Sequence, residues 1–192
     1  LGDCDAPDVI SVAVEYSPTS AWSEQGADKV VAQLNDDTWF DFSAVKVTGS
    51  QIDTAAELAA YDVVVIGDGG DGGSDDLAVF APALRAWVES GEGNVVGTGW
   101  LIFEGGITTG TPNADLDEII PVNTVGNYNF LYNATQVIDD DSHPVTDAVT
   151  DFLVTGCCIE YPSAPQVDGW GTVLGTSGGQ PNIGVAKVPD IR

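Results

Sequence analysis

The segment from Tyr61 to Trp100 constrains the fold more than any other part of the chain. It begins with the apolar run Val63–Ile66, continues through a glycine- and aspartate-rich loop and an amphipathic stretch that Gly91 ends, and starts a second apolar run at Asn94. This order predicts a β-α-β crossover between two buried parallel strands. The apolar residues of the amphipathic stretch recur every three or four positions: Leu77, Phe80, Ala81, Leu84, Trp87 and Val88.

The segments before this crossover extend the alternation of strands and helices. Residues 9–16 predict a strand and residues 22–35 a helix, whereas the partial alternation in residues 40–47 predicts a strand nearer the sheet edge. A short helix is expected over residues 54–60. We therefore predict one α/β domain over residues 1–192, with a doubly wound, mostly parallel sheet and helices on both faces.

The pattern loosens after residue 100. Residues 114–120 predict a short helix that Pro121 stops, and residues 127–137 predict an aromatic strand. Residues 138–147 predict a loop that enters a helical turn. Later strands are expected at residues 151–155, 172–176 and 183–188. The chain stops soon after the last of these, which leaves open a longer exported parent protein.

The charge is extreme. Thirty acidic residues against five basic ones give a formal net charge of −25, which repels phosphate backbones and anionic lipid and attracts cations. We therefore expect no nucleic-acid partner. No apolar stretch approaches the roughly 20 residues that cross a bilayer, so we expect no membrane insertion. Two settings suit this charge, an extracellular or cell-surface protein with calcium available, and a salt-adapted cytoplasmic protein.

The three cysteines, Cys4, Cys157 and Cys158, are too few for a structural zinc site. Three arrangements are open. Cys4 forms a disulfide with Cys157 or Cys158, the adjacent pair forms a vicinal disulfide, or all three are buried thiols. We favour the Cys4 bridge, because the composition resembles that of exported proteins.

Three segments resemble the class I glutamine amidotransferase-like fold, a flavodoxin-like three-layer sandwich: residues 61–67, 84–91 and 95–100. Within that class the chain looks most like the ThuA-like, trehalose-utilization branch. Residues 141–146 are similar to the His-Pro loop of that branch, and residues 170–176 to its late strand. The resemblance covers most of the chain from Tyr61 onward.

Active members of this class carry a cysteine nucleophile at a tight strand-to-helix turn. The resemblance puts that position at Gly99, which has no side chain to attack with. Thr98 is beside the turn, and His143 is the only histidine. They are therefore the remaining catalytic candidates, although a loop histidine before Pro144 also serves simply to shape a turn.

Two acidic segments are candidate Ca²⁺ sites, because carboxylates among glycines suit a hard cation. The first segment supplies Asp68, Asp71, Asp75 and Asp76, and the second supplies Asp139, Asp140 and Asp141. Neither matches the spacing of an EF-hand loop. The first segment also suits a flexible loop in which Ser74 or Asp75 caps the next helix.

Aromatic residues suggest a carbohydrate-binding cleft that Trp100, Tyr128 and Tyr132 would line, although core packing explains the same residues. Our leading hypothesis is a catalytically silent amidotransferase-like domain that acts as an extracellular binding or assembly module. The alternatives are a ThuA-like carbohydrate-modifying enzyme that uses His143 and nearby carboxylates, and a structural subunit of a surface layer or filament that binds copies of itself.

Overall fold

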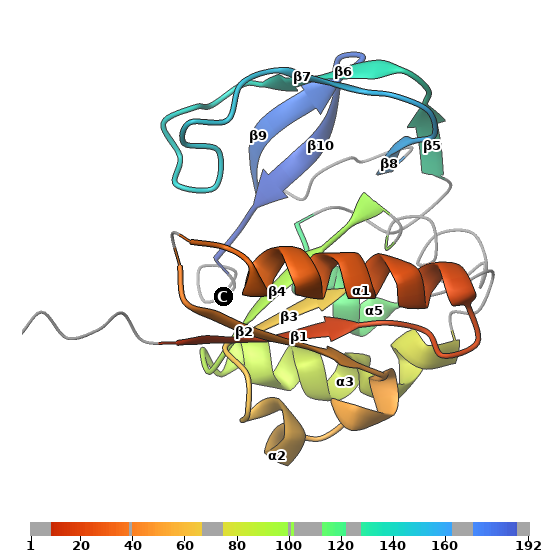
Figure 1. The fold of residues 1–192 in the computed structure, drawn as a ribbon, viewed down its shortest axis with the longest axis vertical. Helices are drawn as coiled ribbons and strands as arrows, with labels where there is room; N and C mark the ends of the chain where they lie inside the picture. The colour runs from red at the N-terminus through yellow and green to blue at the C-terminus, as the bar shows by residue number, and fades with distance from the viewer. Residues whose placement is uncertain are drawn as a thin grey trace, which may run out of the picture. The chain divides into compact units, whose positions relative to one another are not determined.

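The computed structural model describes residues 9–38, 40–66, 75–99, 101, 113–121, 128–162 and 171–187 (Figure 1). The chain divides into two compact units, Leu1–Thr98 and Gly99–Arg192. We describe each unit by itself, and the single domain expected over residues 1–192 stays a prediction. No helix in the described ranges is both long enough and apolar enough to span a bilayer.

The first unit is built on a four-stranded sheet with the strand order β2-β1-β3-β4, and all of its described pairings are parallel. Helix α1 covers one face, and α2 and α3 cover the other (Figure 1). The predicted crossover and the edge position of the second strand are thereby confirmed. The elements are β1 (Ile10–Glu15), α1 (Ala21–Asn35), β2 (Phe42–Val47), the 3₁₀ turn η1 (Gly49–Gln51), α2 (Ala55–Leu58), β3 (Val63–Ile66), α3 (Asp75–Glu89) and β4 (Asn94–Gly97).

Apolar burial holds this unit together. The six apolar residues predicted to form the buried stripe of α3 are all at most 6% exposed. On the opposite face, Ala27 of α1 packs with Val12 and Val14 of β1 and Ala44 of β2. Fully burying a large apolar side chain stabilises a fold by about 1.5–3 kcal/mol, so these two layers supply most of the driving force for the unit.

Strand β4 differs from its prediction. We expected a buried strand, but β4 is at the edge of the described sheet, and Val96 is 50% exposed. The apolar run predicts a strand correctly, but it does not reveal how many neighbours the strand has. The turn before β4 needs a glycine at position 93, because a Cβ there would overlap the indole of Trp87.

The second unit is antiparallel in all its described pairings. One sheet has the order β10-β9-β6-β7, and a second sheet contains only β5 and β8. The predicted mostly parallel sheet is therefore confined to the first unit. The elements of this unit are α5 (Ala114–Asp117), β5 (Tyr128–Leu131), β6 (Ala134–Ile138), β7 (Phe152–Val154), β8 (Ile159–Pro162), β9 (Thr172–Ser177) and β10 (Gln180–Val185).

The aromatic strand expected over residues 127–137 is two strands in different sheets. The chain turns at Asn133, which has a φ of +46°. Its N–H donates to the carbonyl of Gly156 at 3.2 Å, and its Oδ1 accepts from the N–H of Gly156 at 2.9 Å. This reciprocal pair fixes the turn between β5 and β6 against the turn between β7 and β8. Strand β8 and the β9–β10 hairpin turn were not predicted.

Polar side chains fill part of the second unit. Gln136 in β6 is 3% exposed. Its Nε2 donates to Oδ1 of Asn182 at 2.9 Å, and its Oε1 accepts from Nδ2 of Asn182 at 2.6 Å. Ser177 is fully buried and donates its hydroxyl to the carbonyl of Thr135 at 2.9 Å. These bonds tie β6 to β9 and β10.

Candidate functional site

The turn after β4 is the position where the sequence predicts a nucleophile elbow. The N–H of Thr98 donates to the carbonyl of Ile66 at 3.2 Å, which extends the pairing of β4 with β3 by one residue. Helical backbone begins at Gly99. The sequence therefore identifies the strand-to-helix turn correctly, whereas Trp100 lies outside the described residues.

The side chain of Glu160 occupies the space above Gly99. A Cβ built on Gly99 would lie 2.6 Å from Oε2 of Glu160 and 3.3 Å from the Cβ of that residue. Any side chain at position 99 would therefore meet the carboxylate, whose flexible end would have to shift. Burial raises the pKa of the Glu160 carboxyl above its usual value, because partial removal from water disfavours the charged form.

The β5–β8 strand pair has two faces, and Glu160 is on the face that does not pack inward. Leu131 is directly opposite Ile159, which is 8% exposed, and a Cβ on Gly178 of the β9–β10 turn would lie 2.8 Å from Cδ1 of Leu131. This face packs inward. Because side chains alternate along a strand, the next cross-strand pair, Phe130 and Glu160, is on the opposite face.

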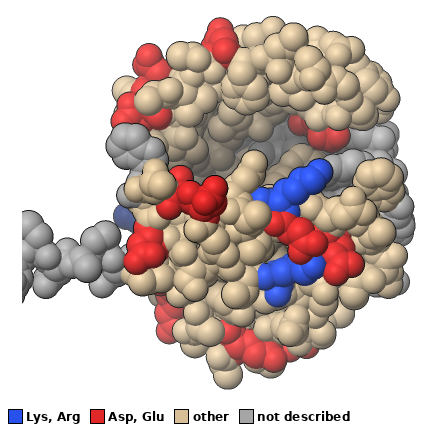
Figure 2. Space-filling model, viewed as in Figure 1, with Lys and Arg blue, Asp and Glu red and all other residues tan. Residues whose placement is uncertain are grey.

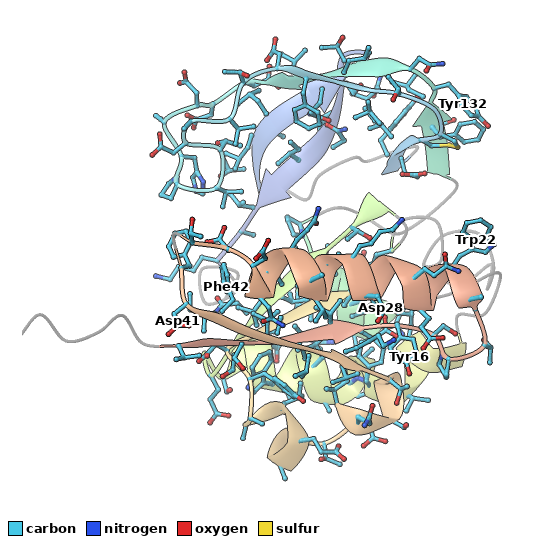
Figure 3. The ribbon with its side chains drawn as sticks, viewed as in Figure 1. Tyr16, Trp22, Asp28, Asp41, Phe42 and Tyr132 are labelled. Carbon is cyan, nitrogen blue, oxygen red and sulfur yellow. A yellow bond between two sulfur atoms is a disulfide. The ribbon has the colours of Figure 1, made fainter. Side chains whose placement is uncertain are left out.

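Two aromatic rings accompany Glu160 on this face. The rings of Phe130 and Tyr132 meet edge to face, with centroids 5.2 Å apart and an interplanar angle of 86°. Phe130 is 42% exposed and Tyr132 is 57% exposed, and Figure 3 shows Tyr132 beside β5. Tyr132, one of the three residues predicted to line a carbohydrate cleft, is thus an exposed aromatic residue. The side chain of Tyr128 and all of Trp100 lie outside the described residues.

The first unit has a second candidate position, at the carboxyl edge of its sheet. The chain passes from β1 to β2 on one side and later returns to β3 on the other side of β1. The carboxyl ends of β1 and β3 therefore form the topological switch point, where open α/β sheets bind ligands. Glu15 ends β1 at this point and is only 1% exposed.

Three buried serines follow Glu15, and their hydrogen bonds explain their burial. The N–H of Ser17 donates to Oγ of Ser23 at 2.9 Å, and the N–H of Ser23 donates to Oγ of Ser20 at 3.2 Å. The second bond caps α1, since Ser20 is its N-cap residue. The serines therefore shape the connection from β1 to α1.

A basic side chain near this edge is neutralised by acidic neighbours. Nζ of Lys46 is 2.7 Å from Oδ1 of Asp28 and 3.0 Å from Oε1 of Glu24, and it is 4.8 Å from the ring centroid of Tyr16. The hydrogen bonds to Asp28 and then to Glu24 raise the pKa of the Lys46 ammonium. On the face of the molecule that Figure 2 draws, basic side chains lie among acidic ones. This cluster fixes α1 to β2 and does not form an anion-binding patch.

His143 and its acidic neighbours form a turn. Nδ1 of His143 accepts from the N–H of Val145 at 3.2 Å, and the carbonyl of His143 accepts from the N–H of Thr146 at 2.9 Å. Asp140 accepts from the hydroxyl and the N–H of Ser142 at 2.7 and 2.9 Å. These bonds lower the pKa of the Asp140 carboxyl. The bonds around His143 are therefore those of a turn-shaping histidine.

The described residues offer no group of three or more His, Cys, Asp or Glu side chains placed to hold a metal ion. Asp139, Asp140 and Asp141 form no such group in this part of the chain, and the second candidate Ca²⁺ site stays a prediction. Asp68 and Asp71 lie outside the described residues, as do the side chains of Asp75 and Asp76, so the first candidate Ca²⁺ site stays a prediction.

Cys157 and Cys158 form a vicinal disulfide, the second of the three expected arrangements. This pairing uses both cysteines that the favoured bridge to Cys4 required. Cys4 itself lies outside the described residues. The disulfide is located between β7 and β8, two residues before Glu160 in the sequence.

The sequence did not reveal two carboxylates, the buried Glu15 and the half-buried Glu160. Glu15 directly follows the apolar run Val12–Val14, and a charge that ends a central strand is a signal for the switch point. Glu160 has no comparable signal, because β8 is short and was not predicted. Its position over Gly99 depends on tertiary structure alone.

Solved structures share this fold. The cytoplasmic protein STM1381 from Salmonella typhimurium LT2 is 17% identical, with a TM-score of 0.67 over 95% of this chain and 84% of that one. The cytoplasmic protein STM3548 from Salmonella typhimurium is 15% identical, with a TM-score of 0.69 over 94% of this chain and 83% of the other.

A putative ThuA-like protein from Bacteroides uniformis ATCC 8492 is 16% identical, with a TM-score of 0.62 over 91% of this chain and 70% of that one. The chain has a ThuA-like fold. The amidotransferase-like α/β class predicted from the sequence, with a parallel sheet between helices, is thereby confirmed. No family model and no curated protein matches the chain, and identities this low show the fold alone.

Proposed function

We propose that this chain is a catalytically silent member of the amidotransferase-like fold and acts as a binding module. One observation supports the proposal most strongly: the Glu160 carboxylate occupies the space that a side chain at position 99 would fill. A thiol at that bend would meet a carboxylate, which disfavours the reactive thiolate. A fold alone does not determine a function, so the proposal depends on this local chemistry.

The turn around His143 gives the proposal further support. Its Nδ1 already accepts a backbone hydrogen bond, so a general base at this residue would have to act through Nε2. The carbohydrate-modifying enzyme, the rival hypothesis, requires His143 to activate a nucleophile or a water. No described contact of His143 serves that purpose.

Turnover assays test whether the chain is catalytically silent. We expect the purified protein to release no ammonia from glutamine and no nitrophenol from p-nitrophenyl glycosides above the buffer rate. Turnover by the wild-type protein that disappears in His143→Ala would overturn the proposal and support the enzyme. Turnover that persists equally in His143→Ala and survives repurification to constant specific activity would also overturn the proposal, whereas turnover lost on repurification belongs to a contaminating hydrolase.

The charge of −25 supports a working environment rich in cations, either outside the cell or in a salt-adapted cytoplasm. Added salt should raise the midpoint of thermal unfolding, because screening weakens the repulsion among the acidic side chains. Titrations with NaCl and CaCl₂ at equal ionic strength separate the two settings. A rise specific to CaCl₂ at sub-millimolar concentration supports a calcium-dependent module, whereas equal responses to both salts argue against one.

A further inference from the structure

The carboxylate of Glu160 lacks a described counter-charge. The described ion pairs are those of Lys46 and Arg85, and neither includes Glu160. A carboxylate that is partly removed from water and has no cation beside it is costly, and either protonation or a bound cation relieves that cost. Glu160 is held in this environment by its strand, since its neighbour Ile159 is buried on the inward face.

The aromatic rings beside Glu160 indicate which chemical class of cation would bind there. Phe130 is directly opposite Glu160 in the antiparallel pair, a position that brings Cβ atoms to about 4.5–5.5 Å. Tyr132 packs edge-on against Phe130 and is more than half exposed. Aromatic faces attract cations that are weakly hydrated, above all substituted ammonium groups. A hydrated metal ion would instead need several oxygen ligands, and the described residues offer no such group.

We propose that Glu160, Phe130 and Tyr132 form a subsite for an organic cation that carries a substituted ammonium group. The carboxylate balances the charge, and the two rings contact the alkyl substituents. Gly99 leaves the room in which the carboxylate lies. The proposal deepens the binding function proposed above and rests on it, because it names the chemical class of the ligand.

Titration with tetramethylammonium chloride tests the subsite, with NaCl replaced to keep the ionic strength constant. Amide chemical shifts of isotopically labelled protein report the dissociation constant. We expect Glu160→Gln to weaken binding about tenfold or more, since the charge is lost while the shape is kept. Tyr132→Leu should weaken it about threefold, the effect of removing one cation–π contact. The matched control Asp147→Asn removes an equal charge from an exposed turn and should leave the constant unchanged.

Gly99→Ala supplies a second variant that keeps the charge. Its methyl group must push the carboxylate aside, so binding should weaken although Glu160 is intact. In the double variant Gly99→Ala with Glu160→Gln, the loss should be no greater than in Glu160→Gln alone, because Gly99 acts through Glu160. Additive losses would contradict that role.

Three results would overturn the subsite: wild-type affinity in Glu160→Gln, an equal loss in Asp147→Asn, or no saturable binding by the wild-type protein. Saturable binding of methyl glucoside that survives Glu160→Gln, without binding of the cation, would identify a sugar subsite instead. These outcomes concern binding alone. Whether the chain is catalytically silent is decided separately, by turnover of glutamine or glycosides.

Discussion

The two units obtain their stability from different sources. In the first unit, helix α3 and the parallel strands bury a periodic set of apolar side chains, and Phe80 and Leu84 are completely inaccessible. In the second unit, the antiparallel strands are joined through buried polar groups such as Gln136 and Ser177. Apolar burial tolerates some change of shape, whereas a buried hydrogen bond requires both partners in place. The strands of the second unit therefore depend on the exact placement of these polar partners.

The largest expected effect tests the apolar side of this comparison. Phe80→Ala removes a fully buried ring from α3 and should lower the free energy of unfolding by about 3–5 kcal/mol. The neighbouring Val79→Ala is the matched control, because Val79 is 47% exposed, and it should change stability by about 0.5 kcal/mol or less. Denaturant unfolding measures both. Equal losses in the two variants would mean that the stripe of α3 does not hold the unit together.

The hydrogen-bonded pair of Gln136 and Asn182 tests the contribution of buried polar groups to the second unit. Gln136→Leu leaves the amide of Asn182 without its partner and should cost about 1–3 kcal/mol. If the pair acts as a unit, adding Asn182→Leu should cost less than the sum of the single changes, with a coupling of about 0.5–3 kcal/mol. A double-mutant cycle in denaturant gives this value. Strict additivity would show that the second unit does not depend on the pair.

The cap of α1 should have a smaller effect. Ser20 accepts from the N–H of Ser23, so Ser20→Ala should destabilise the protein by about 1 kcal/mol, whereas Ser20→Gly should cost only about a few tenths. Thermal unfolding at matched pH compares the two variants. A greater loss in the glycine variant would show that backbone rigidity, and not the cap, matters in this connection.

The smallest effect concerns pH. Because burial raises the pKa of Glu160 in the folded state, its ionisation opposes folding, and the stability present below about pH 4.3 is lost as the pH rises through the folded-state pKa. Glu160→Gln should therefore be slightly more stable than the wild-type protein at neutral pH, with the difference vanishing in acid. A pH series of unfolding midpoints for both proteins checks the sign. A less stable variant at neutral pH would mean that the ionised carboxylate has a favourable partner.

The first unit was predicted well from the sequence, because the signals for its helices and strands lie within short segments of the chain. The buried stripe of α3 and the continuous apolar run of β3 each report secondary structure and burial together. The second unit was harder for a physical reason. The break between β5 and β6 at Asn133 depends on hydrogen bonds to Gly156, which is distant in sequence.

The candidate site divides in the same way. The strand-to-helix turn at Gly99 followed from the pattern of the preceding strand. The carboxylate of Glu160 could not be predicted there, because its approach depends on the pairing of β8 with β5. His143 and the acids before it drew attention through their residue types, yet their hydrogen bonds are mostly with their own turn.

The close approach of Glu160 to Gly99 has a consequence for substitutions at position 99. A mutation that put cysteine at position 99 would set its sulfur against a carboxylate, so that single step would yield a crowded and poorly ionised thiol. The carboxylate would also have to shift, because its Oε2 lies 2.6 Å from the position of a Cβ at residue 99. Thiol chemistry at this bend is therefore favoured only when the carboxylate of residue 160 is displaced or replaced.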